Sequence, residues 1–236
     1  MRDYTFYLDG KCALDYGIRL EQPVEFSETA PIYDAQTIPG RNGDLIFDTG
    51  SYENRSGTAE CFILQNDAID AVGSANKFLL AKKGYRRLQT SEDPAHFWLA
   101  VVENGLSIED RKNVLMPFEV GFDCKPQRFL VNGETPVVFT QSGVINNQYG
   151  FPALPIIKVY GTGAGVVKVG EYEVEIKQNS GLIILDSDMQ SAYDGFANRN
   201  NYIKADQFPV LVDGENHVTF SGAIKRLEII PRWWEL

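Results

Sequence analysis

The chain has 236 residues, of which 44% are hydrophobic and 23% are charged. That length suits one large or two small domains, and the composition excludes a largely disordered chain. The formal net charge of -10 repels phosphate, so we expect no sequence-specific nucleic-acid partner.

No apolar stretch reaches the roughly 20 residues needed to cross a bilayer, and we expect no membrane insertion. The N-terminus lacks the pattern of a secretion signal, which predicts a protein made in the cytoplasm. Cys12, Cys61 and Cys124 are too few and too widely spaced for a disulfide framework or a metal site. We expect them to be buried thiols.

Apolar and polar residues alternate along most of the N-terminal half, which is typical of β-strands. Residues 97–102 are an unbroken apolar run of strand length, which predicts a central strand covered on both faces. The alternating apolar positions are Tyr4, Phe6 and Leu8, then Ala59, Cys61 and Ile63, and then Val114, Met116, Phe118, Val120 and Phe122.

One segment has helical spacing instead, and a helix is predicted at about residues 67–83. Asn66 can cap its start, two aspartates follow in the first turn, two lysines occupy the last turn, and Gly84 suits the stop. The apolar stripe should pack on a sheet. It consists of Ile69, Val72, Ala75, Phe78 and Leu79.

Residues 125–155 are dense in proline and glycine, and we place a domain boundary near residue 130. The predicted domains are residues 1–130 and 131–236. Alternation without helical spacing resumes beyond the boundary and predicts an antiparallel sandwich. A glycine-rich stretch, Gly161 to Gly165, precedes a further strand rather than a helix. It is interpreted as a glycine hairpin and not as a nucleotide-binding loop.

No pattern for catalysis emerges. His96 and His217 are the only histidines, and no Gly-x-Ser-x-Gly sequence occurs. Glu171, Glu173 and Glu175 share one strand face and are interpreted as solvated. We therefore expect a protein that is not an enzyme, with no catalytic, cofactor-binding or metal-binding residues and no cofactor.

A family resemblance rests on short pieces in a fixed order along the chain. Ile38-Pro-Gly-Arg-Asn-Gly-Asp-Leu45, continued by Gly50 to Arg55, resembles the signature of the distal tail proteins of long-tailed bacteriophages. Further matching pieces are Leu88 to Pro94, Phe122 to Pro126, Ala153 to Ile157, Phe208 to Leu211 and the ending Pro231-Arg-Trp-Trp234.

This resemblance implies a mostly β fold, with an N-terminal tail-tube-like β-sandwich carrying one helix and a C-terminal galectin-like sandwich. It implies a homo-hexameric ring at the virion tail tip of a phage or prophage of a Gram-positive host. The implied partners are the tail tube protein, the tail-associated hub protein and receptor-binding proteins, with assembly in the host cytoplasm. An acidic wall of such a ring would repel passing DNA.

Five residues are candidates for interface contacts. Whether Arg41 makes an interface or only occupies a tight bend stays open at this stage. Trp234 follows Pro231 in an extended C-terminus, and of the adjacent Trp233 and Trp234 one indole should point outward. The candidate interface comprises Arg41, Asn42, Tyr52, Arg55 and Trp234.

A different class of function is a carbohydrate-binding β-sandwich adhesin. Such a protein stacks sugars on exposed aromatic rings, for which Trp233, Trp234, Tyr193 and Tyr202 are available.

Overall fold

A computed structural model describes residues 4–64, 68–106, 115–195 and 197–236. The chain divides into two compact units, Met1–Arg128 with Leu236, and Phe129–Glu235. Each unit has its own cluster of buried apolar side chains. The chain is mostly β, as predicted from its alternation.

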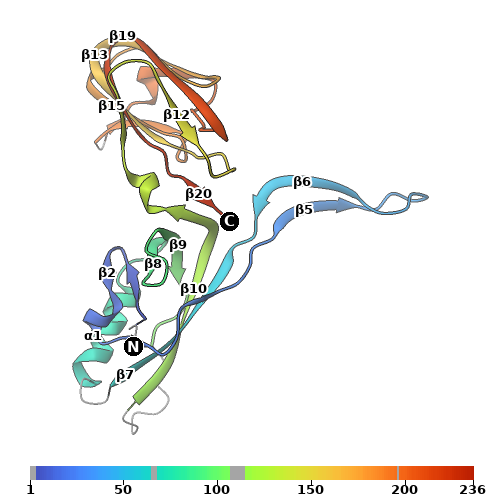
Figure 1. Cartoon of the computed structure of the whole chain (residues 1–236), viewed down its shortest axis with the longest axis vertical. Helices are drawn as coiled ribbons and strands as arrows, with labels where there is room; N and C mark the ends of the chain where they lie inside the picture. The colour runs from blue at the N-terminus through green and yellow to red at the C-terminus, as the bar shows by residue number, and fades with distance from the viewer. Residues whose placement is uncertain (1–3, 65–67, 107–114, 196) are drawn as a thin grey trace. The chain divides into compact units, whose positions relative to one another are not determined.

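In unit 1, an antiparallel sheet has the order β2-β1-β8-β9-β10-β7-β3, with β4 also on β7 (Figure 1). The predicted central strand is confirmed, because β9 lies between β8 and β10. The bounds are β1 (Phe6–Leu8), β2 (Lys11–Cys12), η1 (Ala13–Tyr16), β3 (Arg19–Leu20), β4 (Glu25–Phe26), β7 (Arg55–Leu64), β8 (Arg86–Thr90), β9 (His96–Val102) and β10 (Leu115–Leu130).

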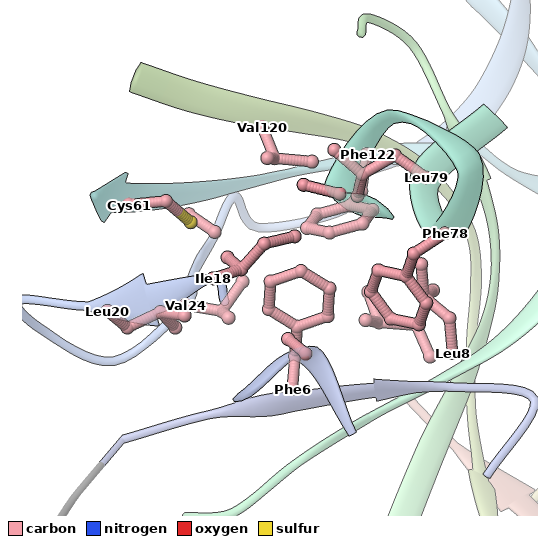
Figure 2. Close-up of a cluster of buried hydrophobic side chains, with 14 of the residues drawn as sticks. Phe6, Leu8, Ile18, Leu20, Val24, Cys61, Phe78, Leu79, Val120 and Phe122 are labelled. Carbon is pink, nitrogen blue, oxygen red and sulfur yellow. The ribbon is translucent and has the colours of Figure 1, made fainter. Parts of the chain in front are cut away.

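The alternating residues of β7 and β10 point into one core. The two strands pair from Leu115 opposite Leu64 to Cys124 opposite Arg55, so their inward positions coincide. Figure 2 shows this cluster, in which the ring of Phe6 lies edge-on to Phe122 with centroids 5.3 Å apart. The expected alternation of buried and exposed positions is confirmed along both strands.

The thiols of unit 1 differ in their access to solvent. Burial raises the pKa of Cys61 and of Cys124 to about 12, whereas Cys12 is only half-buried. At pH 8 we expect a thiol-reactive dye to modify Cys12 promptly and the other two only as fast as the chain unfolds. Rapid modification of all three in the folded protein would contradict this arrangement.

The helix α1 spans Ala68–Leu80 and ends three residues before the predicted end. Arg86 explains the early stop, because its Nη1 donates to the carbonyls of Phe78 (2.7 Å) and Leu79 (3.1 Å). The chain then turns at Gly84, whose φ is +82°. The predicted lysines lie beyond the helix, and the predicted cap Asn66 lies outside the described residues.

The apolar stripe of α1 packs into the core of unit 1, as expected. Ala75, Phe78 and Leu79 are buried, and Val72 packs against the same cluster. Tyr16 stacks on Phe78 with ring centroids 4.4 Å apart, which fixes the helix against η1.

Unit 2 is an antiparallel sandwich with the order β11-β19-β13-β15-β16-β17, in which β12 joins β19, β14 joins β13 and β18 joins β14. The last strand is β20 (Trp234–Glu235). The bounds are η3 (Val131–Glu134), β11 (Val137–Phe139), β12 (Gly143–Asn147), β13 (Ile156–Val169), β14 (Tyr172–Ile176), β15 (Ser180–Asp186), β16 (Ser191–Asp194), β17 (Ala197–Asn198), η4 (Asn200–Tyr202), β18 (Ile203–Ala205) and β19 (Gly214–Ile230).

The predicted glycine hairpin at 161–165 is wrong. These glycines lie inside the 14-residue strand β13, where its pairing with β19 shifts register twice. The reason is a close backbone approach: a Cβ on Gly161 would lie 2.3 Å from the Ala223 carbonyl oxygen, and one on Gly165 would lie 2.4 Å from that of Ser221. The glycines therefore form a bulge between two long strands.

The C-terminal segment is tied to unit 2 by polar bonds. The Arg232 guanidinium meets the buried Asp186 carboxylate through two bonds, of 2.8 and 3.1 Å. The Arg232 backbone N–H donates to the Gly133 carbonyl, and the Leu130 N–H donates to the Trp233 carbonyl. The Pro231 to Trp234 ending is thus a structural anchor.

Candidate assembly interface

The most exposed part of unit 1 is a hairpin of β5 (Pro31–Gln36) and β6 (Leu45–Tyr52). It forms a two-stranded sheet of its own and projects from the larger sheet of the unit (Figure 1). Every residue of β5 is exposed. A lone two-stranded hairpin is marginally stable in water, so this one is suited to pairing with another molecule.

The tip of the hairpin is a defined turn. The Arg41 N–H donates to the Ile38 carbonyl across Pro39 and Gly40, and Gly40 has a φ of +82°, as a type II turn requires. The Thr37 hydroxyl closes the loop on Asp44 at 2.8 Å. This geometry presents the exposed side chains of Arg41 and Asn42 at the end of the hairpin.

Large apolar side chains lie exposed on both faces of the hairpin. Ile46 is opposite Ala35 and Phe47 is opposite Asp34, so Ile46 and Phe47 point to opposite faces. Burying such side chains would be favourable by about 1.5–3 kcal/mol each. The exposed fractions are Ile32 39%, Tyr33 54%, Ile46 53% and Phe47 50%.

The other two candidates from this stretch lie at the base of the hairpin. Tyr52 ends β6 and is half-buried, whereas Arg55 begins β7 and is buried on the core side. The Nε of Arg55 has no hydrogen-bond partner among the described residues. Asn54 between them donates to both oxygens of Asp123, at 3.0 and 3.2 Å, and so fixes the chain where the hairpin leaves the sheet.

Removing the charge of Arg86 should change the free energy of unfolding more than removing the charge of Arg55. Arg86 donates to two helix carbonyls and pairs with Asp9 at 3.1 Å, so we expect Arg86→Met to lower the free energy of unfolding by about 2–4 kcal/mol. Arg55→Met removes a side chain whose Nε is unsatisfied, and we expect a change below about 1 kcal/mol. Urea unfolding checks both, and equal losses would contradict the contrast.

Trp234 belongs to unit 2 and is held there. Its Nε1 donates to the Pro152 carbonyl at 3.0 Å, and its ring stacks on Phe151 with centroids 4.5 Å apart. The neighbouring Trp233 is buried in the core of the unit. The structure therefore groups Arg41 and Asn42 at one end of the hairpin, Tyr52 and Arg55 at the other, and Trp234 on a different unit.

Among the described residues, the histidines and acidic side chains outside the hairpin do not gather into a metal-binding cluster. No cluster of three or more metal-ligating side chains occurs among the described residues, and no described helix is long and apolar enough to cross a membrane. His96 pairs with Asp93 at 2.7 Å, in a short loop, and His217 is exposed on β19. Glu173 and Glu175 are exposed on β14 as expected.

An acidic hollow lies on the outer face of the unit 1 sheet. Glu60 on β7 is directly opposite Glu119 on β10, and Glu21 adjoins them through its N–H bond to the Glu60 carbonyl. These three exposed residues line one shallow depression together with Cys61, Pro117 and Phe118. Like charges directly opposite each other weaken strand pairing, which makes this face costly for a monomer.

Comparison with known protein families finds a match in this part of the chain. Residues 12–124, which contain the hairpin and most of the larger sheet, match the family described as the phage tail protein RIFT-related domain. The RIFT-related domain thus covers nearly all of unit 1.

The whole chain also resembles a solved structure, the crystal structure of the Dit protein of phage SPP1. That protein is described as a paradigm of the hub adsorption apparatus in phages that infect Gram-positive bacteria. The two share 14% identity with a TM-score of 0.69, over 97% of this chain and 98% of that one. No curated protein matches the sequence significantly.

These findings confirm the resemblance to the distal tail family and the β-sandwich fold. The match of residues 12–124 to a phage tail protein family supports a structural component of the virion tail. Sequence reasoning found the turn of the RIFT-related domain but missed the exposed apolar side chains beside it. The available signal was Ile46 next to Phe47: adjacent apolar residues in a strand occupy both faces, so a two-stranded ribbon leaves one exposed.

Proposed function

We propose that the chain forms a closed homo-hexameric ring through its β5–β6 hairpin, and that the ring joins the tail tube protein to the tail-associated hub protein at the virion tail tip. The ring would assemble in the cytoplasm of a Gram-positive host, serve no catalytic purpose and brace receptor-binding proteins. The observation that carries the proposal is a projecting hairpin with apolar side chains exposed on both faces.

The hairpin supports a ring rather than a two-fold dimer. It is a projecting element, and its complement on the neighbouring copy would be a different surface, so the contact is head-to-tail. Head-to-tail contacts generate closed rings when the rotation between copies closes. Apolar residues on both faces favour insertion between two surfaces over docking on one.

The acidic hollow of Glu21, Glu60 and Glu119 fits the lumen of such a ring. A wall of carboxylates repels DNA phosphates and keeps a passing duplex from adhering. The repulsion between Glu60 and Glu119 weakens strand pairing, but in the ring the same charges would keep DNA from adhering. We include this face in the proposal as the lumen wall.

The test compares two pairs of charge substitutions at similarly exposed sites. We expect Ile46→Asp with Phe47→Asp to abolish rings, because each carboxylate would be buried without a partner. The matched control is Val138→Asp with Val144→Asp on unit 2, where the side chains are 52% and 45% exposed, and it should keep the rings. Sedimentation velocity reads out the mass. Rings that survive the hairpin change would overturn the proposal.

The substitution Arg41→Ala tests whether the Arg41 side chain contacts a neighbouring copy or Arg41 only occupies a tight bend. The turn uses the backbone N–H of Arg41 and not its side chain, so alanine leaves the turn intact. We expect the ring to weaken by about tenfold in dissociation constant, as for a charged interface contact. An unchanged constant assigns Arg41 to the bend alone and restricts the interface to the apolar residues.

A further inference from the structure

A polar pocket opens in unit 2, and none of its lining residues takes part in the proposed ring contact. It lies where the segment after β14 meets the start of β15, the end of β16 and the helix η4. Its volume is about 220 Å³. The lining residues are Gln178, Asn179, Ser180, Ile183, Asp194, Arg199 and Tyr202.

The charged wall of the pocket is fixed by internal bonds. Both Nε and Nη2 of Arg199 lie 2.7 Å from one oxygen of Asp194, Oδ2. The guanidinium also lies over the ring of Tyr202, with its carbon 4.9 Å from the centroid. The hydrogen bond that the guanidinium donates to Asp194 is the main cause that raises the pKa of Arg199, so the side chain stays a cation.

The opposite wall is also preorganised. Asn179 is buried, and its Nδ2 donates to the Val159 carbonyl at 3.1 Å while its Oδ1 accepts from the Gly181 N–H at 2.9 Å. Gln178 and Ser180 on either side are exposed, which leaves an amide and a hydroxyl beside the opening. A pocket whose walls are held before a ligand arrives loses little conformational freedom on binding.

The lining chemistry selects one class of ligand. Arg199 and Asp194 cancel each other's charge, so the pocket offers no net attraction to an anion or a cation. Its amides, hydroxyls and carboxylate both donate and accept hydrogen bonds, beside one aromatic ring. The volume lies below the roughly 300 Å³ at which pockets for drug-sized molecules begin, so the ligand is a single ring.

We propose that this pocket binds one saccharide ring, either a free sugar or the terminal residue of a glycan. Neighbouring hydroxyls of a sugar can donate to and accept from the exposed Gln178 amide and Ser180 hydroxyl, and the apolar face of a sugar suits the ring of Tyr202. Of the aromatic residues predicted to stack a sugar, Tyr202 lines this pocket, whereas Trp233 is buried and Trp234 is engaged with Phe151. The proposal does not depend on ring assembly.

The test uses the full chain and the methyl glycosides of glucose, galactose, rhamnose and N-acetylglucosamine. We expect at least one to give saturation-transfer NMR signals and a measurable dissociation constant at up to about 10 mM. Gln178→Ala removes an exposed side chain of the pocket and should weaken that binding about tenfold, as should Arg199→Ala. Lys177→Ala, next in sequence but outside the pocket, is the matched control and should bind normally.

The results of this experiment test the class of ligand and the location of the site separately. No signal from any of the four glycosides overturns the saccharide assignment. Binding that is equal in wild type, Gln178→Ala and Lys177→Ala overturns the location. Thermal unfolding of each variant shows whether Arg199→Ala still folds, and Gln178→Ala decides the question if it does not. Sedimentation of the same samples reports ring assembly independently, so its failure and the failure of sugar binding remain distinguishable.

Discussion

Asp186→Ala is expected to lower the free energy of unfolding of the C-terminal unit by about 3–5 kcal/mol, the cost of removing one partner of a buried ion pair. The Asp186 side chain is 3% exposed and holds both terminal nitrogens of Arg232. Its Oδ1 also accepts the backbone N–H groups of Asp188 and Met189. The substitution therefore leaves the Arg232 guanidinium without its carboxylate partner. It also removes the two hydrogen bonds that hold the turn at Asp188 and Met189.

Two further variants make this result specific. Asp188→Ala changes the same residue type two positions away, where the side chain is exposed, and should stay within about 0.5 kcal/mol of wild type. Asp186→Asn keeps an oxygen for the two N–H groups and should lose less than alanine does. Urea unfolding followed by tryptophan fluorescence measures all three. A loss below about 1 kcal/mol for Asp186→Ala would contradict the anchoring role.

Gly161→Ala is expected to destabilise the same unit by about 3 kcal/mol or more, because the added methyl meets the backbone and not a movable side chain. It would lie 2.3 Å from the Ala223 oxygen and 3.0 Å from the Ile224 Cα. Relief requires β13 and β19 to separate where the bulge joins them.

The same chemical change at Gly73 is the control and should act in the opposite direction. Gly73 lies in α1, and a Cβ there would meet nothing within 4 Å. Alanine should therefore stabilise the helix by about 0.5–1 kcal/mol. Thermal unfolding measures both substitutions, and a stable Gly161→Ala protein would show that the two strands can move apart at little cost.

Much of the fold follows from alternation in the sequence. Phe118, Val120 and Phe122 alternate with polar residues and prove buried on one face of β10, because neighbours in a strand point to opposite sides. Alternation predicts which residues of a strand are buried, but it does not predict which strands pair with each other. The glycines at 161–165 show the limit: their conformation is set by the approach of β19, about 60 residues later in the chain, and local turn chemistry suggested a hairpin instead.

The helix end has a similar explanation. Lys82, Lys83 and Gly84 have the composition of a last turn and a stop, yet the helix closes at Leu80 because Arg86 supplies donors to the final carbonyls. A tertiary contact thus overrode the local pattern.

The candidate interface was predictable in part. The turn at Arg41 was found from its glycines, whose positive φ angles the structure requires. Nothing local distinguishes Arg55, which points into the core, from Arg41, which points to solvent. The adjacency of Ile46 and Phe47 predicts that they point to opposite faces, but their exposure also requires the hairpin to form a separate two-stranded sheet, which local sequence does not predict.

The mass of the wild-type chain in solution, together with negative-stain images, decides whether the chain forms a hexameric ring. We expect closed six-fold rings and a mass six times that of the 26.4 kDa chain, increasingly populated up to about 100 µM. A mass of 26.4 kDa across that whole range, with no rings in the images, would contradict it.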